Sequence, residues 1–140
     1  MNHYYRLNPE VAGGFGDRAE LDSTVHPPVV RRLHYEVADW LGDCLVQTFP
    51  CFLVLRAVGA ALEKAGLGGF ALAEAEVTEA DIFQDLNPGG ALPDLVWLKV
   101  SGTAGSEDFG VSSDNRLVVS ERALAMLRPA GLAHCGVEVY

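Results

Sequence analysis

The residue types that most often do chemistry are few in this sequence, and none stands in a recognised catalytic motif. Ser120 lacks the flanking glycines of a nucleophile elbow, and capping the start of a helix is its obvious role. Cys44 and Cys51 fall in apolar segments, where a thiol is usually buried and unreactive. Glu107 and Asp108 are neighbours in a polar loop, whereas acid–base pairs need side chains that converge in a pocket. These patterns predict no catalytic residues.

The histidines and the glycine-rich segment 13–16 are poor candidates for a ligand site. The histidines at positions 3, 26, 34 and 134 are not clustered at the spacing of metal ligands. The glycines lack the Gly-Lys-Ser/Thr that completes a phosphate-binding loop. We therefore expect no metal and no cofactor, and the alternative is a zinc site assembled from distant cysteines and histidines.

The uneven distribution of charge is the feature that points most directly to a function. The net charge is −9, and no Lys or Arg occurs between Lys64 and Lys99. That stretch holds six of the nineteen acidic residues, which are Glu74, Glu76, Glu79, Asp81, Asp85 and Asp94. Such a cluster repels itself, and it therefore favours a role in binding a basic partner. The alternative is a solvated outer face that only promotes solubility.

Composition sets the class of protein. The chain has 140 residues, of which 49% are hydrophobic and 21% charged, and this predicts one folded domain over 1–140. An acidic surface repels nucleic acids and anionic membranes, so we expect neither as a partner. No secretory h-region and no apolar run near the ~20 residues of a membrane span is found. Three cysteines without a pairing motif indicate reduced thiols, and we expect a cytoplasmic protein.

Periodicity and turn residues predict an α+β fold with a mixed sheet of about six to eight strands and two main helices. Strands are expected at 4–7, 33–38, 44–49, 51–55, 70–77, 95–100, 117–119 and 135–139, and a long loop at 8–30. The polar face of strand 33–38 should include His34. One helix should span 56–65 and end at Gly66, and another should span 121–128 between Ser120 and Pro129. Thr78 should cap a short helix that runs through Asp85.

Two segments of the sequence echo each other at a shift of 65 positions. Leu53-Val54 matches Val118-Val119, and Ala65-Gly66-Leu67 matches Ala130-Gly131-Leu132. Each copy has the pattern of a strand, a helix, a Gly-Leu turn and a strand, with the glycine where the helix must end. The pattern predicts two related β-α-β units, which arose by duplication or are ordinary units with similar turns.

Three segments carry a family resemblance. They are Tyr4-Tyr5-Arg6-Leu7, the stretch from Trp40-Leu41-Gly42-Asp43 to Phe49-Pro50-Cys51-Phe52-Leu53-Val54, and the stretch from Arg116 to Leu124 with its continuation over 131–135. The strand that enters a helix through Ser120-Glu121-Arg122 is the most distinctive of these features. In these segments the chain resembles bacterial immunity proteins of polymorphic toxin systems. The resemblance implies an α+β protein that binds and inactivates a toxin inside the producing cell.

We therefore expect a non-enzymatic immunity protein whose acidic face occludes the active site of a basic toxin. The expected partner-binding residues are Glu74, Glu76, Glu79, Asp81 and Asp85, with Phe83 and Trp97 as aromatic anchors. One alternative is a small enzyme with a pocket assembled from distant residues such as His34, Asp43 and Glu107. Another is an oligomeric accessory protein.

Overall fold

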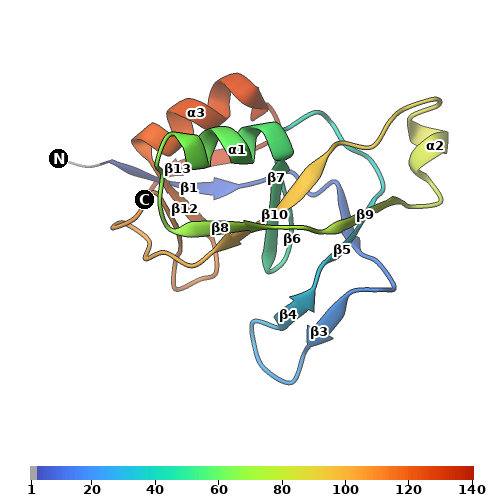
Figure 1. The fold of residues 1–140 in the computed structure, drawn as a ribbon, viewed down its shortest axis with the longest axis horizontal. Coiled ribbons are helices and arrows are strands. Elements are labelled where there is room, and N and C mark those ends of the chain that lie inside the picture. The colour runs from blue at the N-terminus through green and yellow to red at the C-terminus, as the bar shows by residue number, and fades with distance from the viewer. Residues whose placement is uncertain (1–2) are drawn as a thin grey trace.

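The computed structural model describes residues 3–140 as three helices and thirteen strands, which confirms the α+β class (Figure 1). The strands are distributed over four sheets instead of one mixed sheet. Two of these sheets have four antiparallel strands each and form the framework. The first has the order β6 (Leu45–Thr48), β7 (Cys51–Leu55), β10 (Leu95–Val100), β8 (Phe70–Ala73). The second has the order β11 (Phe109–Val111), β12 (Leu117–Ser120), β1 (Tyr4–Asn8), β13 (Gly136–Val139).

The two framework sheets repeat one topology. Helix α1 (Arg56–Lys64) connects β7 to β8, and α3 (Glu121–Gly131) connects β12 to β13. Trp97 of β10 pairs with positions 53 and 73, and Arg6 of β1 pairs with positions 118 and 138. The partners of Arg6 therefore lie 65 positions after the partners of Trp97, which is the shift found in the sequence echo. The same order and register favour duplication, with β1 in the second unit at the place of β10 in the first.

The main hydrophobic core lies between the helices and the framework sheets. Leu62 of α1 and Leu127 of α3 are fully buried in it, together with Val54, Val119 and Phe109 from the strands. The helices α1 and α3 pack against each other over the sheets (Figure 1). An apolar residue at each of these positions removes its side chain from water, which is the main driving force for this layered arrangement.

The remaining elements are insertions into the framework. Strands β2 (Gly13–Phe15), β5 (His34–Val37) and β9 (Glu76–Glu79) form a three-stranded sheet in which β5 and β9 are parallel. Strands β3 (Glu20–Asp22) and β4 (Val29–Arg32) form a two-stranded ribbon, and α2 (Phe83–Leu86) is a single short helix. The ribbon and α2 project from the framework at two different places (Figure 1). A second core beneath the insertions contains Tyr35, Val37, Leu53 and Phe83.

Several boundaries differ from the sequence predictions. Residues 8–30 contain strands, because Gly13 allows β2 to approach β5 so closely that a Cβ would overlap the Glu36 carbonyl. The expected strand 70–77 is broken between β8 and β9, and Thr78 lies in β9 instead of capping a helix. Pro129 lies inside α3 and does not end it. Proline cannot donate the hydrogen bond of an ordinary helical residue, but the packing of Ala130 on the core retains the last turn.

Across residues 3–140, none of the helices combines the length and the hydrophobicity that crossing a bilayer requires.

Candidate functional site

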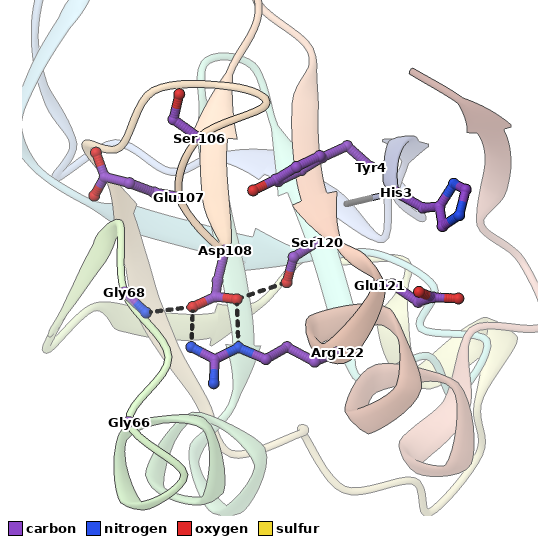
Figure 2. Close-up of a pocket in the computed structure, with 10 residues that line it drawn as sticks. All are labelled: His3, Tyr4, Gly66, Gly68, Ser106, Glu107, Asp108, Ser120, Glu121 and Arg122. Atoms are coloured by element: carbon purple, nitrogen blue, oxygen red, sulfur yellow. Dashed lines mark hydrogen bonds and ion pairs between the residues drawn. The ribbon is translucent and has the colours of Figure 1, made fainter. Parts of the chain in front are cut away.

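A cleft of about 550 Å³ lies where the start of α3 meets the loop after α1 and the loop before β11 (Figure 2). The Asp108 carboxylate in this cleft accepts hydrogen bonds from the Gly68 N–H (2.9 Å) and the Ser120 hydroxyl (2.7 Å). It also accepts two from the Arg122 guanidinium, at 2.8 and 2.7 Å. These donors, Arg122 above all, hold the pKa of Asp108 well below its ordinary value. An ionised carboxylate with four donors is a structural clamp and a poor general base.

Ser120 confirms the predicted N-cap. Its hydroxyl oxygen accepts a hydrogen bond from the Ala123 N–H at 3.2 Å, and its proton is donated to Asp108. The hydroxyl therefore satisfies one free amide at the start of α3 and joins that helix to the loop before β11.

Replacing Ser120 by alanine should lower the free energy of unfolding by about 1–2 kcal/mol, because the cap and the bond to Asp108 are both lost. Urea unfolding measures this change. Ser106→Ala is the matched control, since Ser106 lines the same cleft but is exposed, and its loss should be below about 0.5 kcal/mol. Equal losses in the two variants would contradict the structural role of Ser120.

Asp43 is the counterpart of Asp108 in the first unit, 65 positions earlier in the chain. Its carboxylate accepts hydrogen bonds from the His134 N–H at 2.9 and 3.2 Å. Asp43 thus holds the loop after α3, while Asp108 holds the loop after α1. The backbone beside each aspartate contacts the same loop. The Cys44 N–H donates to the Gly131 carbonyl, and the Phe109 N–H donates to the Gly68 carbonyl. The two aspartates clamp the units to each other.

The surroundings of the two aspartates differ in charge. Asp108 faces Arg122, whereas the position equivalent to Arg122 in the first unit is Ala57. Beside Asp43 lies a second carboxylate, that of Glu10, which accepts hydrogen bonds from the Leu41 N–H (2.7 Å) and the Asp43 N–H (3.3 Å). Sequence analysis missed this cluster because Glu10 carries no motif and contacts its partners only in the folded chain.

The residues expected to build an enzyme pocket are in three different surroundings. His34 is buried, contrary to the expected polar face, and its Nε2 lies 2.7 Å from the Thr78 hydroxyl. Asp43 lies against His134, and Glu107 accepts a hydrogen bond from the Thr103 N–H. These contacts do not assemble a triad from His34, Asp43 and Glu107.

The thiols of Cys44 and Cys51 are buried, as the apolar sequence around them predicts. Burial raises the pKa of each thiol to about 12. A thiol that keeps its proton at neutral pH is a weak nucleophile. Neither cysteine therefore has the environment of a reactive residue.

The acidic stretch was expected to repel itself because it contains no Lys or Arg, but three of its six acidic residues pair with arginines from other segments. Glu74 and Asp94 both contact Arg56, at 2.9 and 3.1 Å. Glu76 contacts Arg18, and Arg32 at 3.3 Å. The hydrogen bonds from Arg56 and Arg18 lower the pKa values of Glu74 and Glu76. The fold supplies these arginines from segments outside the stretch, so these carboxylates are already neutralised.

Glu79, Asp81 and Asp85 are different, since none of them pairs with a Lys or Arg in the described part of the chain. All three are exposed around α2. Phe83 is buried in the second core and is unavailable as an aromatic anchor. Trp97 is half-buried, and the Lys99 ammonium lies 4.8 Å from its ring centroid, where it would repel a basic partner.

The exposed apolar residues of this segment are instead Ile82, the N-cap of α2, which is 48% exposed, and Leu86 at the end of α2, which is 50% exposed. They are four positions apart, and the Leu86 N–H donates to the Ile82 carbonyl, so their side chains share one face of the helical turn. Asp81 and Asp85 have the same spacing one position earlier. This combination of apolar and acidic side chains is the candidate docking surface, defined by Asp81, Ile82, Asp85 and Leu86.

The fold defines an α+β protein made of two antiparallel four-stranded units with one helix each, and with insertions that carry the candidate docking surface. Comparison of the sequence with protein-family models and with curated proteins found no match.

Proposed function

We propose that this chain is an immunity protein that binds a basic toxin and occludes its active site through the docking surface on α2. The observation that carries the proposal is the exposure of Ile82 and Leu86 beside two carboxylates, Asp81 and Asp85, that pair with no Lys or Arg of residues 3–140. An apolar centre with a charged rim is the usual composition of a protein interface. The resemblance to immunity proteins supplies the class of partner.

The docking surface is held in place before any partner binds. The Gln84 amide donates to Glu79 at 2.9 Å and to the Gly90 carbonyl at 3.2 Å, which ties the two sides of the α2 segment together. The Asn87 amide donates to Asp39 at 3.3 Å, and Phe83 anchors the turn in the core. A preorganised surface loses little conformational entropy on binding, so more of the contact energy appears as affinity.

The charges favour a basic partner. The net charge of −9 attracts a cationic protein over long range, and Asp81 and Asp85 direct that attraction to α2. Many toxins that act on nucleic acids need a basic substrate cleft, because they bind a phosphate backbone. An acidic surface with an apolar centre complements such a cleft in charge.

Co-expression with the product of the neighbouring open reading frame tests the proposal. We expect the chain to rescue growth and to co-purify with that product as a 1:1 complex. A chain that assembles into a defined oligomer by itself and neither rescues growth nor binds the product would support the accessory-protein alternative. Light scattering and growth curves provide the two measurements.

The association rate of that complex should fall on the order of tenfold between low and high salt, because salt screens the steering by acidic residues. Stopped-flow mixing measures the rate. Asp81→Asn with Asp85→Asn should flatten the salt dependence. The matched control is Asp94→Asn, whose carboxylate is already paired with Arg56 and should contribute little. An association rate independent of salt would argue against acidic docking.

A further inference from the structure

Glu10, Asp43 and His134 come together from three loops on one side of the framework. Glu10 follows β1, Asp43 precedes β6, and His134 precedes β13. One ligand atom from each residue lies within 4.8 Å of the other two. The two carboxylate residues are 5% and 1% exposed, while the His134 side chain is 44% exposed. The two carboxylates of the cluster are therefore buried, and the cluster is open to solvent on the side of the imidazole.

Within the described residues, the only ionisable partner of this carboxylate pair is the His134 imidazole, which lies 3.2 Å from Asp43. In residues 3–140, neither Glu10 nor Asp43 forms an ion pair with Lys or Arg. In the second unit, the equivalent carboxylate of Asp108 pairs with Arg122. In the first unit, the carboxylates of Asp43 and Glu10 lie together without such an arginine. Buried charges are normally paired or bound to a metal, because an isolated charge in the interior is costly.

We propose that Glu10, Asp43 and His134 bind a divalent transition-metal ion, with Zn²⁺ as the best match. His134 Nδ1 lies 3.2 Å from Asp43 Oδ1. Two ligands about 2.0–2.2 Å from one tetrahedral zinc ion are themselves about 3.3–3.6 Å apart, so the observed separation is close to that of two ligands sharing an ion. One imidazole and two carboxylates are a donor set that suits zinc, and water can complete the coordination on the open side.

The backbone already orients both carboxylates. Glu10 accepts the Leu41 and Asp43 amides, and Asp43 accepts the His134 amide, which leaves further lone pairs on each carboxylate for an ion. Hydrogen bonds from groups that do not touch the metal commonly orient the ligands that do. The neighbouring Cys44 is excluded from the ligand set because its thiol is buried in the core and donates to the Leu127 carbonyl.

Titration of the chelator-treated full-length chain with Zn²⁺ tests the site. We expect one ion to bind per chain and to raise the melting temperature, since the ion binds only the folded state. Mg²⁺ should give no comparable shift, because it prefers six oxygen ligands. His134→Ala should weaken Zn²⁺ binding at least tenfold without unfolding the protein, because the Asp43 bonds to the backbone amide remain. Glu10→Gln should also weaken binding while keeping an oxygen for those amides.

The controls separate this site from adventitious zinc. His26→Ala should leave Zn²⁺ affinity unchanged, since His26 stacks on Phe49 at the opposite end of β6. Co²⁺ bound in place of Zn²⁺ should show no thiolate-to-cobalt charge-transfer band. Wild-type affinity in His134→Ala, loss of binding in His26→Ala alone, or no saturable Zn²⁺ binding would each overturn the proposal. The inference does not depend on toxin binding, so either can fail alone.

Discussion

Replacing Asp108 by asparagine is expected to lower the free energy of unfolding by about 2–3 kcal/mol. The wild-type carboxylate accepts four hydrogen bonds, and hydrogen bonds to a charged group contribute more than neutral ones. The asparagine NH₂ group would face N–H donors and could not replace the second oxygen. Much of the loss should come from Gly68 and Ser120, because Arg122 is largely exposed and its ion pair is screened by water. Urea unfolding at neutral pH measures this difference.

The pH dependence of that difference provides the control. Because the folded-state pKa of Asp108 is lowered, its stabilisation is complete above the ordinary carboxyl range and is lost as the pH falls toward the folded-state pKa. The gap between wild type and Asp108→Asn should therefore close in acid. Asp94→Asn, which removes an exposed partner of Arg56, should cost less than about 1 kcal/mol at any pH. A gap that stays constant down to low pH would contradict the clamp.

Replacing both Ile82 and Leu86 by aspartate is expected to weaken the complex with the toxin by about 100-fold or more. Central apolar contacts of an interface can contribute about 2 kcal/mol each, and 1.4 kcal/mol corresponds to a tenfold change in affinity. The stability of the free chain should change little, because both side chains are about half exposed and Phe83 still anchors the turn. Calorimetry of the complex and urea unfolding of the free variant measure the two effects.

The projecting ribbon offers a matched control for this double variant. Val25 and Val29 are about as exposed as Ile82 and Leu86, and they lie in the other projecting insertion. Replacing both valines by aspartate should leave the affinity within a few-fold of wild type. Loss of binding in the valine variant with full binding in the Ile82 and Leu86 variant would transfer the docking surface from α2 to the ribbon.

Local features of this fold are readable from the sequence. Gly66 has a φ of +77° at the end of α1, as its position after an apolar helix predicts, and Ser120 caps α3. Seven of the eight framework strands overlap the expected ranges, because alternating or continuous apolar runs report burial directly. The eighth, β11, was not expected, because the segment before Val111 is polar and rich in turn residues. The echo between Leu53-Val54 and Val118-Val119 also corresponds to equivalent strands in the two units. These features depend on near neighbours in the chain, and near neighbours are visible in a sequence.

The tertiary structure decided which charged side chains pair with one another. Arg56 neutralises Glu74 and Asp94 from positions 18 and 38 residues away, and His134 meets Asp43 across 91 residues. No local pattern encodes such contacts, since they depend on which loops the sheets bring to the same edge. The sequence alone determined an α+β framework with an excess of acid. Only the packing of distant segments decided which carboxylates pair with arginines. The same packing left the carboxylates at α2 without a Lys or Arg partner among residues 3–140 and brought Glu10 and Asp43 beside His134.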